Sequence, residues 1–475
     1  MRPSKKTGRF LSEDPGDLDA PVGEVIYSVG SVHHAVESAR KAFLPWSSLS
    51  IGARARHLKA FKYALARHTE AITLLITREM GKPLEESRAE VQRVLSKVDT
   101  ACVEEAKLLA PCERGVSNGL KAQLSYRPRG VIAVLSPFNV PLHLAASPTL
   151  SALLAGNTVV LKPSEITPFV GQAIAQVWKK AGLPSGVFNL VHGKGDTGSA
   201  LVEHPGVDGV LFTGSWMTGS SIQAKLLSQP GKICALEMGG KNAAIVLKDC
   251  DLDLAVGECV KGSFLTTGQR CNATSRVLVE RKIADAFVER FLKRAAALRV
   301  GYGTEKGVLM GPLSSEKGLK HVASMLAKAK HEGFKVLRTG GKADGARRGY
   351  YWKPSVHLRS GAPSFSLKEG SYADEEILGP DAAIYIVENV DEAITLNNRP
   401  RYGLVTSVFT RSYSSQKKVL RQAQSGLVNI NASTVNSSSL LPFGGLKRSG
   451  NGRPAGFFTG LLCTVPTSVL SREAT

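Results

Sequence analysis

Short apolar runs that alternate with helical segments dominate the chain from residue 131 onwards. The runs are VIAVL, TVVLKP, VFNLV, GVLFTGS and AAIVL. Brief apolar runs joined by helical crossovers are typical of a parallel sheet that is buried on both faces. The pattern therefore predicts a doubly wound α/β fold in this part of the chain.

The residues before this point have a helical pattern and carry more charge. In residues 31–46 apolar side chains recur at helical spacing opposite charged ones, which predicts an amphipathic helix. Two more helices are expected in residues 51–80 and 83–110. Gly81-Lys82-Pro83 separates them, because glycine and proline interrupt helices.

A second α/β stretch begins near residue 238, where we place the main domain boundary. RVLVE, AAIYIV, SVFT and LVNIN have the composition of strands. One helix face is marked by Ile283, Phe287, Phe291 and Leu298. The β-prone tail after Gly450, LLCTVPTSVL, is expected either to return to the first domain or to pair with a neighbouring chain.

The composition is that of a folded multidomain protein. The chain has 475 residues, of which 43% are hydrophobic and 21% charged. These values exclude a mostly disordered chain and indicate about two to four domains. The seven cysteines include no CxxC pair, so we expect neither a disulfide framework nor a zinc site, and a reducing, cytoplasmic environment.

No membrane segment is expected. The basic start MRPSKKTGRF is followed by no apolar signal sequence. The charge-free stretch 131–161 is interrupted by Pro137, Pro141, Pro148 and Gly156, whereas a membrane span needs about 20 uninterrupted apolar residues. This stretch therefore indicates a strand, a loop, a helix and a second strand.

The formal net charge of +21 admits several kinds of partner. Nucleic acid, anionic surfaces and acidic small molecules all attract a basic protein. Because no Arg-rich tail or RGG tract is present, we favour a solvated basic surface. Attraction of an anionic substrate is the second interpretation.

Cys271, in GQRCNATSR, is a candidate nucleophile. A thiol attacks as the thiolate and needs a partly exposed, electropositive environment. Gly268 permits a tight turn before it, and Arg270 adds positive charge. The alternative is a small buried hydrophobic residue, which is the commoner fate of a free cysteine.

Two more polar residues follow apolar runs. Glu237, in CALEMGGKN, is a candidate general base, and the two glycines after it suggest close backbone approach. Asn139, in SPFNVP, can donate a hydrogen bond to an oxyanion. The alternatives are a solvent-facing glutamate at a strand end and an asparagine in a turn.

Two segments are candidates for binding phosphate and ribose. FTGSWMTG follows a strand and opens a helix, where exposed amides favour phosphate, although the G-x-G-x-x-G fingerprint is missing. Lys162 and Glu165, in LKPSE, follow another strand. Ribose hydroxyls would bind there, at the carboxyl edge of the sheet.

Taken together, these segments resemble the NAD(P)-dependent aldehyde dehydrogenase superfamily. The resemblance runs from about residue 20 to residue 460 and rests on the order as well as the identity of its motifs. The motifs are SPFNVP, LLAGNTVVLKPSE, AGLPSGVFNLV, LFTGS, LEMGGKN, GQRC, EEILGP and PFGGLKRSGNGRP.

The resemblance implies a role for each catalytic residue. Cys271 would attack the aldehyde to give a thiohemiacetal and then a thioester. Asn139, with the backbone N–H of Cys271, would hold the oxyanion, and Glu237 would activate the hydrolytic water. Covalent catalysis of this kind divides one oxidation into two easier steps.

The resemblance also implies the cofactor residues. They would be Phe138, Lys162, Glu165, Gly214, Ser215 and Glu376. The carboxylate of Glu165 would repel a 2′-phosphate, so NAD is expected as the cofactor, with NADP as the alternative. Two positions depart from the family pattern, because Leu378 stands where phenylalanine is usual and Phe138 where tryptophan is commoner.

Within the superfamily the sequence is most similar to the branch that oxidises N-succinylglutamate 5-semialdehyde in bacterial arginine catabolism. Pro454, in SGNGRPAG, stands where most relatives carry glutamate. A dianionic substrate would suit a basic protein, and semialdehydes of glutamate or succinate are the alternatives. Arg453 and Lys447 are as compatible with a structural role as with substrate contact.

A domain organisation follows from the same resemblance. Residues 1–116 and 131–237 would form the NAD-binding domain and residues 238–440 the catalytic domain. Residues 117–130 and 441–475 would supply an oligomerisation hairpin and a bridging tail. A homodimer or homotetramer is expected, because an exposed apolar edge strand is a liability in a monomer. No metal is expected.

Two functions other than hydrolytic aldehyde oxidation are compatible with this fold. Relatives that transfer the acyl group to CoA or phosphate tend to lack the LEMGG glutamate, which is present here as Glu237. A non-catalytic protein that uses this fold and its basic surface for binding nucleic acid or membrane would be expected to lose a catalytic residue. Neither feature is seen, so a hydrolytic aldehyde dehydrogenase is favoured.

Overall fold

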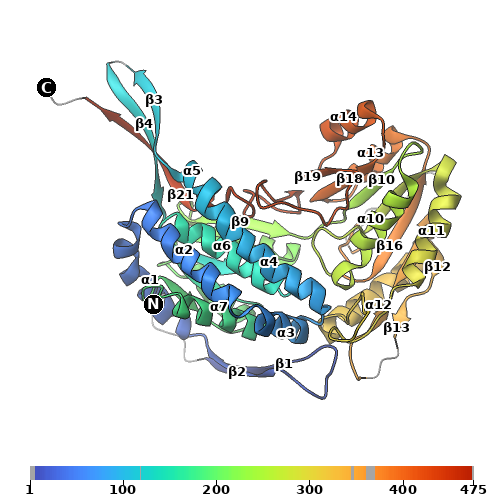
Figure 1. Cartoon of the computed structure of the whole chain (residues 1–475), viewed down its shortest axis with the longest axis horizontal. Coiled ribbons are helices and arrows are strands. Elements are labelled where there is room, and N and C mark those ends of the chain that lie inside the picture. The colour runs from blue at the N-terminus through green and yellow to red at the C-terminus, as the bar shows by residue number, and fades with distance from the viewer. Residues whose placement is uncertain (1–5, 118, 344–346, 360–369, 473–475) are drawn as a thin grey trace.

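Two parallel sheets, each covered by helices on both faces, lie side by side in the computed structural model (Figure 1). The structure describes residues 6–117, 119–343, 347–359 and 370–472. The parts of the expected segments 1–116, 117–130 and 441–475 that fall at residues 1–5, 118 and 473–475 therefore lie outside the described residues.

The first sheet has five parallel strands in the order β7-β6-β5-β8-β9. The strands are β5 (Val131–Leu135), β6 (Thr158–Lys162), β7 (Phe188–Leu190), β8 (Gly209–Gly214) and β9 (Ile233–Met238). The chain moves outward from β5 in one direction through β6 and β7, and then in the other through β8 and β9. Ligands of such sheets bind at the carboxyl ends of the strands where this reversal occurs.

Both faces of this sheet are buried, which explains its uninterrupted apolar runs. Ile132 and Val134 of β5 pack against one helical layer, and Val131 and Ala133 pack against the other. The first layer contains α2 (Ile51–Ala66), α3 (Thr69–Met80), α4 (Leu84–Thr100), α6 (Pro141–Leu154) and α7 (Pro168–Lys180). The second contains α1 (Ser31–Ser47), α8 (Gly195–Glu203) and α9 (Trp216–Leu226).

The helices before the first sheet differ in one place from the prediction. Residues 51–80 form two helices, α2 and α3, with Arg67 and His68 between them. The side chains of His68 and Thr69 bond the carbonyl groups of Ala64 and Ala66, so side chains satisfy carbonyls at the end of α2. The predicted break after α3 is confirmed, and α4 continues into a π-helical turn (Ala101–Glu105) and α5 (Ala106–Leu109).

The second sheet has seven strands in the order β12-β15-β16-β11-β10-β18-β19, all parallel to their neighbours except β12. They are β10 (Ala243–Val246), β11 (Arg276–Glu280), β12 (Lys335–Arg338), β15 (Ser355–Arg359), β16 (Asp381–Val387), β18 (Val405–Phe409) and β19 (Leu427–Ile430). AAIVL therefore belongs to this sheet, as β10, and not to the first.

Helices cover both faces of the second sheet as well. One face carries α10 (Leu252–Phe264) and α11 (Ala284–Ala296), and the other α12 (Glu316–His331), α13 (Val390–Asn398) and α14 (Tyr413–Gln422). Phe287 and Phe291 of the predicted helix face are fully buried, with ring centroids 5.7 Å apart. Ile283 and Leu298 flank α11 at its two ends.

A three-stranded antiparallel sheet projects from the first unit (Figure 1). It consists of β3 (Cys112–Ser117), β4 (Leu120–Pro128) and β21 (Thr464–Ser471). The C-terminal tail thus returns to the first unit, with Thr464 opposite Pro128. The hairpin starts at Cys112, ahead of the expected start at residue 117.

The remaining elements are short. They are β1 (Thr7–Ser12) with β2 (Gly23–Ser28), β13 (Gly341–Lys342) with β14 (Trp352–Lys353), β17 (Tyr402–Gly403) with β20 (Leu446–Lys447), and α15 (Thr459–Leu462). None of the helices in the described ranges is both long and apolar enough to cross a membrane. The charge-free stretch 131–161 forms β5, α6 and β6, as predicted.

Candidate active site

A cavity of about 430 Å³ lies along the carboxyl ends of β5, β6 and β8. We call it the first cavity. Residues from the second unit, Cys271 and Glu376, complete its wall. All of the residues singled out from the sequence as catalytic or cofactor-binding line it: Phe138, Asn139, Lys162, Glu165, Gly214, Ser215, Glu237, Cys271 and Glu376.

A second cavity, of about 590 Å³, lies between α4, α6 and residues 435–443. Its lining shares Asn139, Glu237 and Cys271 with the first cavity. These three side chains therefore stand where the two cavities meet. A group held in one cavity and a group held in the other would both reach them.

The loop before Cys271 is held in an unusual backbone conformation. Thr266 and Thr267 have φ of +56° and +57°, and Gly268 has φ of +68°. A Cβ atom at Gly268 would lie 2.1 Å from the carbonyl oxygen of Gly379, so the predicted need for glycine is confirmed. Left-handed non-glycine residues that cluster in a buried loop are typical of functional sites.

The backbone of Cys271 itself is pinned by the MGGKN segment. The side-chain amide of Asn242 donates to the carbonyl of Cys271 at 2.8 Å and to that of Ala273 at 2.9 Å. The Cys271 side chain is half-buried. It is thus presented to both cavities from a fixed loop, and the alternative of a fully buried structural cysteine is wrong.

The charge around Cys271 differs from the prediction. The guanidinium of Arg270 donates to Thr266 Oγ1 at 2.7 Å and pairs with Glu86 at 3.3 Å, so its charge is largely compensated. Burial, followed by the nearby carboxyls of Glu237 and Glu376, raises the pKa of the Cys271 thiol well above its usual range. Arg270 opposes this rise, as its predicted positive charge requires, but burial and the two carboxyls outweigh it.

Glu237 lies in β9 with only 1% of its surface exposed. Neither of its carboxyl oxygens has a hydrogen-bond partner among the described residues. Burial raises its pKa well above the ordinary value, and Arg453 opposes this only in part. The solvent-facing alternative is thus wrong, and a buried carboxyl without partners is poised to bond a thiol or a water molecule.

The two glycines after Glu237 are required by close packing. A Cβ atom at Gly239 would lie 1.9 Å from a carboxyl oxygen of Glu376, and one at Gly240 would lie 2.9 Å from the carbonyl oxygen of Cys271. The amide of Gly240 also donates to Glu376 at 3.1 Å. The predicted close backbone approach is confirmed.

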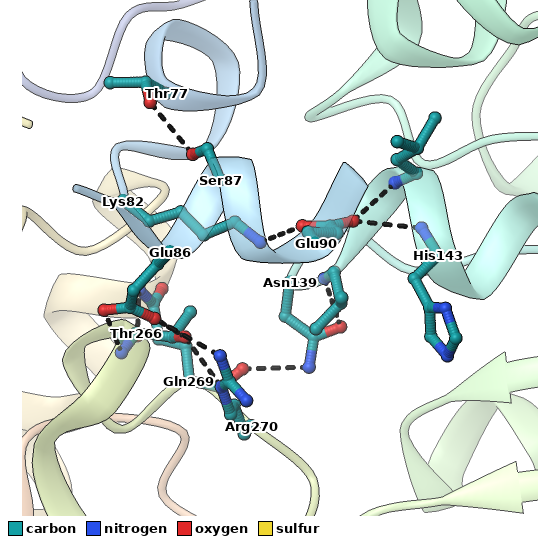
Figure 2. A network of polar contacts seen from close by, with 12 residues as sticks. Thr77, Lys82, Glu86, Ser87, Glu90, Asn139, His143, Thr266, Gln269 and Arg270 are labelled. Atoms are coloured by element: carbon teal, nitrogen blue, oxygen red, sulfur yellow. Dashed lines mark hydrogen bonds and ion pairs between the residues drawn. The ribbon is translucent and has the colours of Figure 1, made fainter. Parts of the chain in front are cut away.

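Asn139 is buried and its amide is oriented by two backbone groups. Its Nδ2 donates to the carbonyl of Gln269 at 2.9 Å, and its Oδ1 accepts from the amide of Val140 at 3.0 Å (Figure 2). One of the two Nδ2 hydrogens is thereby used and the other is free to bond an oxyanion beside the Cys271 loop. The asparagine thus sits in a turn, as the alternative had it, and also lines both cavities.

The cofactor candidates offer a donor set suited to a dinucleotide. The Lys162 ammonium lies 3.8 Å from the carboxylate of Glu165, which fits a site for vicinal ribose hydroxyls. Ser215 caps α9 by accepting from the amide of Thr218 at 3.3 Å, and this helix start faces the first cavity. Glu376 is half-buried, and desolvation raises its pKa to about 8.

A model of the aldehyde dehydrogenase family matches residues 12–465. The chain belongs to the aldehyde dehydrogenase family. It is therefore an NAD(P)-dependent aldehyde oxidoreductase.

Relatives and solved structures agree with this assignment. The chain is 35% identical to N-succinylglutamate 5-semialdehyde dehydrogenase of Burkholderia mallei (strain SAVP1), over 96% of this chain and 92% of the relative. A putative aldehyde dehydrogenase from Burkholderia cenocepacia superposes with a TM-score of 0.92 and 33% identity, over 98% and 95% of the two chains. An NAD⁺ complex of aldehyde dehydrogenase from Bacillus cereus superposes with a TM-score of 0.92 and 30% identity, over 98% of this chain and 94% of that chain. The predicted fold class is confirmed.

Two basic residues of this aldehyde dehydrogenase, Lys447 and Arg453, have structural roles. Lys447 donates to the carbonyls of Asn398 and Pro400 at 2.6 and 3.1 Å. Arg453 donates to the carbonyl of Gly445 at 2.6 Å. Neither residue lines the first or the second cavity.

A buried ion pair that sequence reasoning missed supports the Asn139 turn in this dehydrogenase. Glu90 of α4 pairs with Lys82 and accepts from the amides of Leu142 and His143 at 2.8 and 3.0 Å (Figure 2). A carboxylate at a helix start satisfies free amides and complements the helix dipole. It therefore fixes the first turn of α6, directly after Asn139.

A buried glutamate also caps the start of α7. The carboxyl of Glu79 accepts from the amides of Phe169 and Val170 at 2.9 and 2.7 Å, and burial raises its pKa to about 7. The helices that follow β5 and β6 thus both begin against a buried glutamate from the N-terminal helices. Such residues leave one signal in the sequence, which is a charged residue on the apolar stripe of an amphipathic helix.

Proposed function

We propose that this enzyme oxidises an aldehyde to a carboxylic acid through a thioester on Cys271. The observation that carries the proposal is that Cys271, Glu237 and Asn139 meet at the junction of the two cavities. The aldehyde would enter through the second cavity and the cofactor would lie in the first. NAD, when bound, supplies the hydride acceptor for the oxidation.

Each side chain has one task in this proposal. Cys271 Sγ attacks the carbonyl carbon, and the free Nδ2 hydrogen of Asn139 bonds the oxyanion that forms. Because burial raises the pKa values of the thiol and of the Glu237 carboxyl, both groups must release their protons to solvent water, the thiol as Sγ attacks and Glu237 before it acts as a base. Glu237 then takes a proton from the water that hydrolyses the thioester.

We propose NAD as the cofactor, held by the first cavity. Lys162 and Glu165 would bind the adenosine ribose, and Phe138, Gly214 and Ser215 would line the path to the pyrophosphate at the start of α9. Glu376 would accept from a hydroxyl of the nicotinamide ribose. Leu378 also lines this cavity, with φ of +50°, and would take the place of the ring that is usual there.

Glu165 tests the preference for NAD over NADP. Glu165→Gln removes the negative charge that opposes a 2′-phosphate while Lys162, 3.8 Å away, remains to attract it. The ratio of kcat/KM for NADP to that for NAD is expected to rise about tenfold, a typical effect of one charge in a partly exposed site. Steady-state kinetics with both cofactors measure it, and an unchanged ratio would exclude Glu165 as the selective group.

We propose N-succinylglutamate 5-semialdehyde as the substrate. Support comes from the relatives that bear this name and match 96% of the chain. It also comes from the basic character of the chain, with a net charge of +21, since opposite charge raises the local concentration of an anionic substrate.

A panel of aldehydes assayed with NAD tests the reaction and the substrate together. We expect the highest kcat/KM with N-succinylglutamate 5-semialdehyde, lower values with the semialdehydes of glutamate and succinate, and the lowest with betaine aldehyde. Added CoA should leave the turnover rate unchanged, because Glu237 provides hydrolysis. A preference for betaine aldehyde would refute the substrate, and faster turnover with CoA would refute the hydrolytic route.

We propose that the domains and their assembly follow the family pattern. Residues 1–116 and 131–237 would bind NAD, and residues 238–440 would carry Cys271. The projecting sheet has open edges at β3 and β21 with exposed apolar side chains such as Val116 and Leu470. Pairing of these edges in a homodimer or homotetramer would protect them from aggregation.

A further inference from the structure

The polar side chains that line the second cavity come mainly from two segments. One wall is a face of α4 on which Ala89, Gln92, Arg93 and Ser96 recur at helical spacing. Three consecutive serines, Ser437 to Ser439, contribute to the opposite segment. Among the described residues that line this cavity, Glu237 is the sole acidic one. The other polar side chains of the lining are cations or hydrogen-bond donors, and they lie among apolar residues such as Leu144, Val435 and Phe443.

Arg93 is the cation in this lining that the protein leaves uncommitted. The second basic residue, Arg270, is bonded to Glu86 and Thr266. The Arg93 guanidinium, by contrast, forms no hydrogen bond or ion pair with any part of the chain that the structure describes. Its surroundings also lower its pKa, mainly by desolvation. Arg93 is an exposed residue, so an anion that enters the cavity can reach a guanidinium that has no partner within the described part of the protein.

The acidic residues of α4 near Arg93 are engaged elsewhere. Glu90 bonds Lys82 and the first turn of α6, and Glu86 bonds the amide of Thr266 at 3.0 Å. Both are held by several donors, so neither is free to turn toward Arg93. The helix thus delivers one positive charge to the cavity.

We propose that Arg93 binds the carboxylate at the far end of the substrate and makes the enzyme selective for anionic aldehydes. The inference rests on the proposed function, because the aldehyde carbon must lie at Cys271 for the rest of the molecule to extend into the second cavity. The planar guanidinium matches a carboxylate with two parallel hydrogen bonds.

The serine segment assists by offering donors with fixed positions. The Ser438 hydroxyl accepts from the amide of Leu440 at 3.2 Å, and the Ser439 hydroxyl bonds Thr100 of α4 at 3.0 Å. The second bond ties the segment to the helix that carries Arg93. A carboxylate has more acceptor sites than one arginine fills, and these serines line the same cavity as Arg93.

Arg93→Gln, assayed with matched anionic and neutral aldehydes, tests the proposal. With N-succinylglutamate or succinate semialdehyde we expect kcat/KM to fall about 10- to 100-fold, mainly through KM, as loss of a charged hydrogen bond implies. With butanal or pentanal the value should stay within about twofold, because these substrates have no group for Arg93 to bind. Arg93→Lys should recover part of the loss, since it restores the charge without the planar fork.

Arg88→Gln is the matched control. Arg88 lies on the same helix, but pairs on the outer surface with Glu70 and Glu85 at 2.9 Å, and lines neither cavity. The Arg88→Gln variant should have the wild-type kcat/KM with both anionic and neutral aldehydes. An equal loss for anionic and neutral aldehydes with Arg93→Gln, or no loss with either, would overturn the proposal.

Failure of the proposed function gives a different result. If the wild type prefers succinate semialdehyde to the succinylated compound, the proposed substrate is wrong and the comparison with butanal still tests Arg93. If the wild type oxidises no aldehyde, calorimetric binding of N-succinylglutamate to wild type and Arg93→Gln decides the matter. Weaker binding to the variant supports the inference, and equal binding refutes it.

Discussion

Replacement of Cys271 by alanine is expected to abolish NADH formation from every aldehyde. The nucleophile has no substitute at the junction of the two cavities, because Cys271 is the one cysteine among their described lining residues. Loss of a covalent nucleophile typically lowers kcat by on the order of ten-thousandfold or more. The measurement is single-turnover and steady-state absorbance of NADH.

Cys112→Ala serves as the control for this experiment. Cys112 is an exposed free thiol on the projecting sheet, remote from the site in sequence and outside both cavity linings. It should retain wild-type kinetics. NAD binding should survive in Cys271→Ala, because the proposed cofactor contacts come from other side chains. A Cys271→Ala enzyme that still formed NADH at a comparable rate would refute the covalent route.

The residues of the candidate site were readable from the sequence because they stand at strand ends. In a parallel sheet the carboxyl ends share one edge, so motifs after VIAVL, TVVLK and GVLFTG must come together whatever the helices do. Asn139, Lys162 and Ser215 are of this kind. Glu237 has a similar position, because it is the penultimate residue of β9.

The environment of the site was not readable in the same way. Arg270 is next to Cys271 in the sequence, yet its guanidinium forms an ion pair with Glu86 of α4, which is distant in the chain. Glu90 and Arg93 belong to a helix whose pattern indicates an ordinary amphipathic element. Their roles depend on which face of that helix meets α6 and the second cavity. Tertiary packing decides this, and periodicity alone does not.

The break between α2 and α3 illustrates the same limit locally. No glycine or proline marks it, and the pattern continues across Arg67 and His68. Side-chain bonds from His68 and Thr69 to the preceding carbonyls end α2 there. Local capping of this kind competes with helix continuation, and composition does not reveal it.

Glu237→Gln is expected to separate the two halves of the reaction. Formation of the thioester should still release about one NADH per active site in a burst, whereas steady-state turnover should fall about 100-fold or more because no base activates the hydrolytic water. Stopped-flow absorbance measures the burst and the later rate together. Loss of the burst, with folding intact, would show instead that Glu237 is needed before hydrolysis.

The stability of the same variant tests the buried environment independently of activity. In the wild type the folded pKa of Glu237 lies well above the ordinary value of 4.5, so above that pH the folded state binds more protons than the unfolded state. Linkage then requires the contribution of Glu237 to stability to fall as pH rises from about 4.5 toward the folded pKa. Glutamine has nearly the same shape as glutamate and does not titrate. Neither carboxyl oxygen of Glu237 has a hydrogen-bond partner among the described residues, so the substitution breaks no hydrogen bond there.

The melting temperature of Glu237→Gln should therefore exceed that of the wild type by a margin that widens as the pH rises above about 4.5. Thermal unfolding of both proteins at a series of pH values measures the margin. A margin that is constant with pH would mean that Glu237 is not buried as a neutral acid. In that case the carboxylate would already be ionised before the aldehyde arrives, and it could act as a base directly. A widening margin together with a retained burst would mean that the carboxyl is neutral in the resting enzyme and releases its proton to solvent before it accepts one from the hydrolytic water.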